Sequence, residues 1–285
     1  MVKDVRLLLV LVTVFAVGPW AAVSADAETA DTAKRVTLAL RQATLVQSMG
    51  GAACFAMAGL DADRNATLAL EHADSYNTTL VGLRDGHDWL GLEPVRDPQH
   101  LTAIAATQNI WQGFRPAIYQ LIAGDMHSAV MRQIMRDTDG TVDASNALAT
   151  HFLATLDVAG LGAGTQRAAQ RAAGTRMLTQ RALREMCFVL YDLGGADMRN
   201  RLAATLDEID AAFATVSNGD GDVAPPPNAR VARNLRTAQL FWGKMRPTLD
   251  AVLGPSPPDA MAVQKMLKLN RSVIKQLDQA VEGYF

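Results

Sequence analysis

The stretch GTRMLTQRALREMCF, residues 174–188, decides the fold because the chain carries a second version of it. The other copy is RQATLVQSMGGAACF, residues 41–55. A shift of 133 residues places Leu45, Gln47, Cys54 and Phe55 on Leu178, Gln180, Cys187 and Phe188. The chain has only two cysteines, and they occupy matching places in the two copies. This match indicates an internal repeat, which has to be recognised before any fold is assigned.

Further matches extend the repeat beyond this stretch. The same shift places Leu80 on Phe213, Leu83 on Val216 and Gly86 on Gly219. At a shift of 131 residues, WQGFRPAI from Trp111 matches WGKMRPTL from Trp242. Because large aromatic side chains are usually buried for packing, we assign both tryptophans to the core.

The composition predicts an all-α protein. Of the 285 residues, 49% are hydrophobic and 20% are charged, and stretches rich in Ala, Leu, Arg and Gln dominate. No run of alternating β-branched residues is present. The formal net charge of −2 and the lack of a basic cluster argue against a nucleic-acid partner.

Each half divides into helices separated by Gly- and Pro-containing segments, where a helix cannot continue. In the first half we expect helices over residues 31–83, 99–122 and 145–156, with GDMHSAVMRQIMRD forming a further short one. In the second half the expected helices cover residues 165–216, 229–253 and 258–281. The prediction is therefore two tandem antiparallel helical-bundle modules, residues 26–159 and 160–285, related by a pseudo-twofold.

The N-terminus has the pattern of a secretory signal peptide, residues 1–25. A basic start, MVKDVR, precedes LLLVLVTVFAV and then small residues suited to cleavage after Ala25 or Ala27. We expect a periplasmic or secreted protein if this segment is removed. If it is retained, residues 7–25 are long enough to anchor the protein in a membrane. In an oxidising compartment the two cysteines are candidates for one disulfide.

One helical stripe carries the polar residues of the repeated stretch. At 100° per residue, one face of the second-half helix holds Arg176, Thr179, Gln180, Leu183 and Cys187. The matching first-half stripe holds Ala43, Val46, Gln47, Gly50 and Cys54. If the two helices pack side by side and parallel, Cys54 faces Cys187 and Gln47 faces Gln180. This arrangement predicts a disulfide between Cys54 and Cys187, which Gly50 and its small neighbours permit by close helix approach.

The same geometry places Arg176 in the seam opposite Ala43, with Arg41 half a turn earlier on the first helix. A guanidinium in a partly dry seam is costly unless a negative group accompanies it. One candidate is a small planar oxyanion held by Arg176, Arg41, Gln47 and Gln180. The alternatives are a carboxylate such as Glu185 or Asp192, or an arginine that extends to water.

The string GTRMLTQR resembles RQRMLSQRM, the signature of the PilJ-type N-terminal domain of type IV pili methyl-accepting chemotaxis transducers. The matching residues are Arg176, Met177, Leu178, Gln180 and Arg181 in the second half, and Arg41, Gln42, Leu45, Gln47 and Met49 in the first. The resemblance covers nearly the whole chain after its first 25 residues as two tandem copies. It implies four-helix sensor bundles related to NarX/NarQ-like nitrate sensor domains.

In the nitrate-receptor branch, this resemblance implies, an arginine from each of two parallel helices grips nitrate across a dimer interface. The corresponding positions here are Arg176 and Ala43, so Arg41 is the residue that would replace the missing partner. The second membrane span and the cytoplasmic signalling part of such receptors have no counterpart in the sequence. We therefore expect a membrane-bound receptor, transporter or signalling protein as the partner.

The sequence predicts a binding protein rather than an enzyme. No catalytic constellation or dinucleotide fingerprint occurs, and the five histidines show no metal-ligand spacing, so neither a metal nor a cofactor is expected. The expected function is a secreted or periplasmic ligand-binding or sensory accessory protein for a small oxyanion such as nitrate or nitrite. The alternative is a non-catalytic structural or protein-interaction bundle without a small-molecule ligand.

Overall fold

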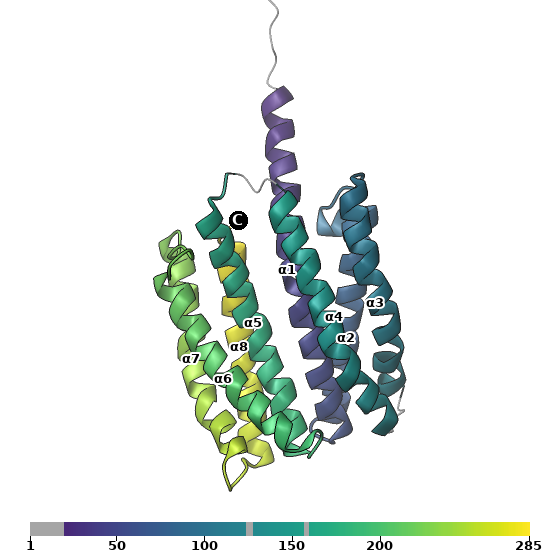
Figure 1. Ribbon diagram of the computed structural model, residues 1–285, viewed down its shortest axis with the longest axis vertical. Coiled ribbons are helices and arrows are strands. Elements are labelled where there is room, and N and C mark those ends of the chain that lie inside the picture. Colours follow the sequence, from purple (N-terminus) through teal and green to yellow (C-terminus); the bar gives the residue numbers. More distant parts are fainter. Residues whose placement is uncertain (1–19, 124–127, 157–159) are drawn as a thin grey trace, which may run out of the picture.

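The computed structural model describes residues 20–123, 128–156 and 160–285. This part of the chain is all α-helical apart from turns, as the sequence predicts (Figure 1). Eight α-helices are described in it: α1 (Trp20–Met57), α2 (Ala62–Asp85), α3 (Pro98–Ile122), α4 (Ser128–Thr155), α5 (Ala163–Leu190), α6 (Gly195–Asn218), α7 (Ala229–Leu253) and α8 (Ala260–Glu282). A single 3-10 turn, η1 (Asp88–Leu90), lies between α2 and α3.

The helices form two groups of four that meet along one seam. Within the first group α1 packs on α2 and α4, and α3 packs on both α2 and α4. In the second group α5 packs on α6 and α8, and α7 packs on α6 and α8. The main contact between the groups is α1 against α5, which lie side by side at the centre of the molecule (Figure 1). The all-α bundle is thus as predicted, and the pseudo-twofold relation stays a prediction.

Two long helices expected from the sequence are each broken in two. The expected helix 31–83 is wrong, because α1 ends at Met57 and α2 begins at Ala62. Between them Gly59 and Asp61 take the left-handed conformation, with φ of 74° and 49°. The expected helix 165–216 is wrong for the same reason, since Asp192 and Gly194 have positive φ between α5 and α6. A shift of 133 residues relates these two turns.

A second correction concerns α4, which is one helix where the sequence predicts a break at DTDGTVD. Gly140 of that segment lies inside α4, and a single glycine costs a helix only about 1 kcal/mol. The buried Thr138 hydroxyl donates to the Ile134 carbonyl oxygen at 2.5 Å, one turn back along the same helix. Burial of this face therefore outweighs the local signal, and the separate short helix expected there is the start of α4.

The repeat markers lie in corresponding structural places. Gly86 and Gly219 end α2 and α6 with φ of 79° and 75°. Trp111 and Trp242 are buried core residues, as predicted. The indole Nε1 of each donates to the preceding helix, Trp111 to Asn77 at 3.2 Å and Trp242 to Asp210 at 2.6 Å. Asn77 and Asp210 are themselves 133 residues apart.

Most of the predicted signal peptide lies before residue 20, where the described part of the chain begins. Residues 1–19 of the predicted signal peptide lie outside the described residues, and α1 begins at Trp20. The first turns of α1 extend beyond the bundle (Figure 1). Within residues 20–123, 128–156 and 160–285, no helix is long and apolar enough to cross a membrane.

Candidate functional site

The seam between α1 and α5 carries the predicted disulfide. Cys54 and Cys187 are bonded, with their Cα atoms 6.2 Å apart, and neither is accessible to solvent. The two helices run parallel, because the contacts of Thr44 with Arg176 and of Gln47 with Met177 precede the disulfide in the same order on both. The prediction from matching cysteine positions is confirmed.

Glycines on α1 set how closely α5 approaches. A Cβ atom on Gly50 would lie 3.1 Å from the Cδ of Arg184, tighter than most real contacts. A Cβ atom on Gly51 would lie 3.5 Å from the backbone of Arg184, which is an ordinary contact. The side chain of Arg184 therefore crosses the seam in the space that Gly50 leaves free.

Arg176 is buried in the seam and held on three sides. Its Nε donates to the Thr44 hydroxyl at 3.2 Å, and its Nη2 donates to the Leu40 carbonyl oxygen at 2.9 Å. Its Nη1 forms an ion pair with Asp278 of α8. Burial lowers the pKa of this guanidinium, and the Asp278 charge opposes that effect. The geometry is that of the alternative interpretation, an arginine paired with a carboxylate, although the carboxylate is neither Glu185 nor Asp192.

None of the other three residues predicted to bind an anion is a hydrogen-bond partner of Arg176 in the described part of the chain, although the charge of Arg41 contributes to lowering the Arg176 pKa. Gln47 is buried, and its Nε2 contacts the Met177 sulfur at 3.8 Å. Arg41 is exposed on α1. Gln180 faces an open cleft on one side of the seam. The anion-binding role of this set stays a prediction.

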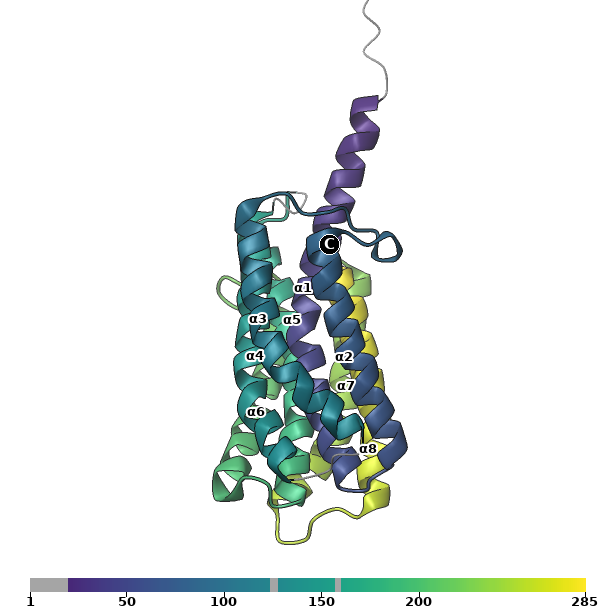
Figure 2. The ribbon, with the colours of Figure 1, turned by 90° about the vertical axis from the view of Figure 1, so that its right-hand side faces the viewer.

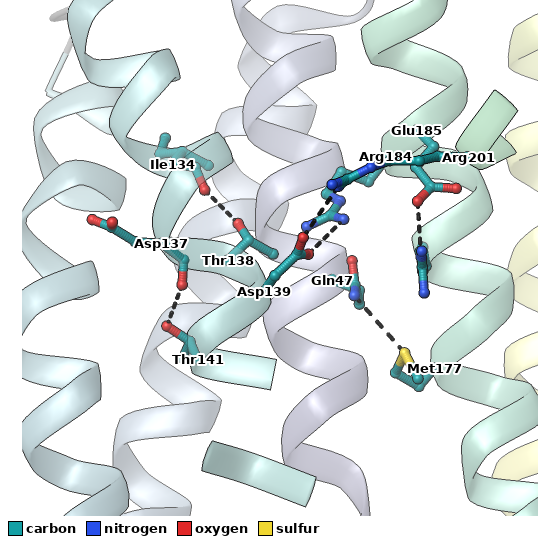
Figure 3. A network of polar contacts seen from close by, with 11 residues as sticks. Gln47, Ile134, Asp137, Thr138, Asp139, Thr141, Met177, Arg184, Glu185 and Arg201 are labelled. Atoms are coloured by element: carbon teal, nitrogen blue, oxygen red, sulfur yellow. Dashed lines mark hydrogen bonds and ion pairs between the residues drawn. The ribbon is translucent and has the colours of Figure 1, made fainter. Parts of the chain in front are cut away.

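Sequence reasoning missed Arg184, the second buried arginine of α5. It is 2% exposed, and its Nη2 donates to Asp139 of α4 at 2.9 Å (Figure 3). Its Nε and Nη1 have no hydrogen-bond partner among the described residues. Burial lowers the pKa of Arg184, and Asp139 opposes that shift. The one sequence signal for this residue is that its counterpart in the first copy is Gly51, which leaves room across the seam.

A shallow groove lies over the Arg184–Asp139 pair, between α4 and α6. Its volume is about 270 Å³, and Arg201 of α6 reaches Asp139 at 3.4 Å from the far side (Figure 3). The groove is lined by Met135, Arg136, Asp139, Arg184, Phe188, Gly194, Asp197, Met198 and Arg201. The ion pairs of Asp139 with Arg184 and Arg201 span this groove.

A larger cleft of about 1080 Å³ lies on the opposite side of the seam, between α2 and α8. These two helices lie on the same side of the molecule, away from α4 and α6 (Figure 2). The floor comes from α1 and α5, through residues such as Gly51, Phe55, Gln180 and Leu183. The walls come from α2 and α8 and carry most of the charged residues.

The walls of this cleft hold four cationic side chains: Arg64, Lys268, Arg271 and Lys275. None of them forms an ion pair within the part of the chain that the structure describes. The acidic lining residues are Asp61, Glu71, Asp278 and Glu282, of which Asp278 is engaged by Arg176. The cleft is therefore polar, and its cations have no fixed counter-charge.

Polar groups in the cleft also lack partners. Asn270 of α8 is 6% exposed, and its Oδ1 is buried without a hydrogen bond. The Nδ1 atom of His72 is buried without a partner as well. Burial, with a smaller contribution from the charge of Arg41, lowers the pKa of His72 to about 4. Since a buried amide without hydrogen bonds is rare in native proteins, Asn270 requires an explanation.

The cleft and the groove are lined by corresponding positions. A shift of 133 residues takes the α1 and α2 lining onto the α5 and α6 lining, and a shift of 132 takes α4 onto α8. By these shifts the groove residues correspond, in the order given above, to Leu267, Lys268, Arg271, Gly51, Phe55, Asp61, Arg64, Asn65 and Leu68. Every one of these lines the cleft. Gly51 thus stands where the groove has Arg184, and Arg271 stands where it has Asp139.

Metal binding has no support from the arrangement of side chains. Among the described residues, no group of three or more His, Cys, Asp or Glu side chains is placed to hold a metal ion. His100 and His151 do meet, with Nδ1 and Nε2 2.9 Å apart, which the sequence spacing does not reveal.

Comparison with known proteins gives no family. No protein-family model matches the chain, and no curated protein matches it. The resemblance to PilJ-type and NarX-like domains stays a prediction based on the motif residues.

Proposed function

We propose that this chain is a non-catalytic ligand-binding or sensory accessory protein whose ligand occupies the cleft between α2 and α8. The observation that carries the proposal is the combination of a cleft of about 1080 Å³ with unpaired cations and a buried amide that makes no hydrogen bond. Ligand sites are concave, partly apolar and furnished with a few convergent polar groups.

The disulfide is compatible with a compartment outside the cytoplasm. We place the protein in the periplasm or outside the cell, where its ligand-bound form would act on a membrane-bound receptor, transporter or signalling partner. A tandem PilJ-type architecture is part of the same proposal, and its support is the motif around Arg176.

A small oxyanion such as nitrate or nitrite remains within this proposal, but the cleft is a better location for it than the guanidinium of Arg176. All three nitrogens of that guanidinium already donate to Thr44, Leu40 or Asp278. An anion would have to displace the Asp278 carboxylate, which would then lose its partner. The cleft cations need no such exchange.

The test is thermal denaturation with nitrate, nitrite, sulfate, short carboxylates, amino acids and sugars. A ligand at 100 times its dissociation constant stabilises the native state by about 2.7 kcal/mol. Leu68→Trp adds bulk at the cleft wall, where Leu68 is 37% exposed, and should abolish the effect of any ligand bound there. The matched control is Leu240→Trp, because Leu240 is exposed on α7 outside the cleft.

A second candidate function is protein interaction through the turn that contains η1. Trp89 is 88% exposed there, the most exposed large hydrophobic side chain of the described residues. Tryptophan is enriched at interaction hot spots. If no compound raises the melting temperature, and Trp89→Ala abolishes capture of a partner from a periplasmic extract, the interaction function is supported instead.

A further inference from the structure

We propose that the ligand of the α2/α8 cleft is an organic anion, with its acidic group between Arg64, Lys268 and Arg271 and its apolar body along the floor. This inference rests on the proposed function and specifies the class of ligand. It is carried by three observations: the charge along the cleft, the buried Asn270 side chain without a partner, and the comparison with the α4/α6 groove.

The charge is unevenly distributed along the cleft. The chain directions of α2 and α8 agree, so low numbers on both helices lie toward the disulfide end (Figure 2). Three cations, Arg64, Lys268 and Arg271, lie toward that end with one carboxylate, Asp61. Glu71 and Asp278 each lie seven residues further along, about 10 Å by the helical rise. The end near the disulfide is therefore positive and attracts an anionic group.

The groove on the other side indicates what is missing here. In the groove, Arg184 rises from the floor and meets Asp139 on the wall. At the corresponding positions of the cleft, the floor has Gly51 and the wall has Arg271. The wall charge has changed sign, and the floor supplies no side chain to neutralise it. A ligand anion above Gly51 would provide the counter-charge that Arg271 lacks.

The α8 wall beside Arg271 also offers a free hydrogen-bonding group. Asn270 makes no side-chain hydrogen bond within the described ranges, although only 6% of it is exposed. Its counterpart in α4 is Thr138, whose hydroxyl is satisfied by the Ile134 carbonyl oxygen. The Nδ2 of this amide is a donor, so Asn270 can donate from Nδ2 to an acidic group held by Arg271, while the buried Oδ1 would accept from a donor on the ligand or from water.

The apolar body of the ligand is inferred from the remaining lining. The apolar side chains of the cleft are Phe55, Leu68, Leu183, Leu267 and Ile274. They come from all four helices that enclose the cleft. An inorganic anion would leave this surface uncovered, whereas an acid with an apolar chain or ring would cover it.

The probes are octanoate, acetate and 1-octanol, measured by isothermal titration calorimetry with the full chain in its disulfide-bonded form. Octanoate carries both the charge and the apolar chain, acetate carries the charge, and octanol carries the chain. We expect octanoate to bind at least tenfold more tightly than either of the others. Equal binding of octanol and octanoate, or no binding of octanoate, overturns the inference.

Charge variants locate the acidic group. Arg271→Ala and Lys268→Ala should each weaken octanoate binding by about tenfold to a hundredfold, the usual effect of losing a hydrogen bond to a charged group. The control Arg233→Ala removes an exposed arginine of α7 outside the cleft and should leave octanoate binding unchanged. Unchanged binding in Arg271→Ala overturns the anion site.

The two levels of the proposal fail in distinguishable ways. A neutral or cationic ligand that is blocked by Leu68→Trp but indifferent to Arg271→Ala would refute the organic anion and preserve the ligand-binding cleft. Octanoate that binds Leu68→Trp as tightly as the wild-type chain would refute the cleft as its site.

Discussion

The α4/α6 groove and the α2/α8 cleft are lined by residues at corresponding positions of the two halves. The side chains and charges at those positions differ. In the groove, Arg184 crosses from α5 to Asp139, and Arg201 adds a third charge. At the matching positions of the cleft are Gly51, Arg271 and Leu68. The groove measures about 270 Å³ and the cleft about 1080 Å³.

The difference shows how one floor residue can change the charge balance of such a hollow. In the groove, the arginine on the floor forms an ion pair with a carboxylate on the wall. A glycine at that position leaves the space open and the wall cation without a partner. Both sides therefore share the same order of helices, while the cleft has the larger space for a ligand.

The disulfide joins α1 to α5, whose residues form the floors of both the groove and the cleft. Removing it should lower the free energy of unfolding more than any of the substitutions below. Cys54 and Cys187 join α1 to α5 over 133 residues, and the loop-entropy model for that separation gives about 5 kcal/mol. Cys54→Ala with Cys187→Ala should therefore lower the free energy of unfolding by several kcal/mol, measured by urea denaturation. Adding reductant to the wild-type chain should reproduce this loss and leave the double variant unaffected. A double variant as stable as the oxidised wild type would show that the seam does not depend on the bond.

The next largest effect should separate the two hollows directly. Asp139→Ala leaves the buried Arg184 guanidinium without its carboxylate, and because Asp139 is itself 52% exposed the cost should lie below that of a fully buried pair, at about 2 to 3 kcal/mol. Arg271→Ala, at the corresponding position of the cleft, removes an exposed side chain with no ion pair in the described chain. Its stability should stay within about 0.5 kcal/mol of the wild type. Thermal and urea denaturation of both variants measure the contrast.

A double variant checks that charge burial is the cause. Arg184→Met with Asp139→Leu replaces the pair by apolar groups, which is often neutral or stabilising. It should therefore be more stable than Asp139→Ala alone. If Arg271→Ala lost as much stability as Asp139→Ala, the two walls would be equivalent and the contrast between them would be wrong.

The sequence reveals the framework of this comparison because the repeat is strongest in α1 and α5. Cys54 and Cys187 fall at matching positions, and that alone is enough to predict parallel helices and the bond between them. The buried tryptophans and the glycines that end α2 and α6 follow from the same alignment. These features can be predicted because the residues that form them match between the two copies of the repeat.

The groove and the cleft depend on contacts between residues far apart in the chain, which the sequence pattern does not reveal. Asp278 lies 102 residues from Arg176, and no local spacing links the two. The helices α4 and α8 match in which positions are buried rather than in residue type. Thr138 and Asn270 are both buried, whereas the next residues, Asp139 and Arg271, have opposite charges. The turn at Gly59 and Asp61, which separates α2 from α1, has no proline or glycine cluster to mark it.

A pH effect should distinguish the cleft from the matching position on α6. His72 has a folded-state pKa of about 4, below its usual 6.5, and its counterpart Thr205 does not titrate. Between pH 6.5 and 4 the unfolded chain binds a proton at His72 and the folded chain does not. Stability from this residue is therefore complete above pH 6.5 and is lost as the pH falls toward 4, by about 2 to 3 kcal/mol.

The variant His72→Thr copies the α6 residue and should remove this component. The difference in unfolding free energy between the wild-type chain and His72→Thr should decrease as the pH falls from 7 to 4, followed by urea denaturation at each pH. A constant difference over that range would show that His72 titrates normally, with its ring accessible to water in the cleft.

A smaller effect on stability than that of Asp139→Ala should come from rebuilding the groove inside the cleft. Gly51→Arg with Arg271→Asp places on α1 and α8 the pair that α5 and α4 already have. A Cβ atom at position 51 lies 3.5 Å from the Arg184 backbone, so the new side chain can begin there without moving α5. Position 51 is buried, so loss of hydration by the new arginine opposes its pairing with the new carboxylate, and the unfolding free energy should fall by about 1 to 2 kcal/mol.

Ligand binding should respond to the same double variant very differently. The new pair would occupy the space above position 51 and turn the Arg271 cation into an anion, so octanoate binding should fall by at least tenfold. Gly51→Ala separates bulk from charge, because it adds only a Cβ atom and should weaken octanoate binding far less than the double variant does. If the double variant kept full octanoate affinity, the floor position would not decide the contents of the cleft, and the correspondence with the groove would be one of packing alone. Loss of affinity with stability retained would instead tie the open cleft to the single glycine that stands in place of Arg184.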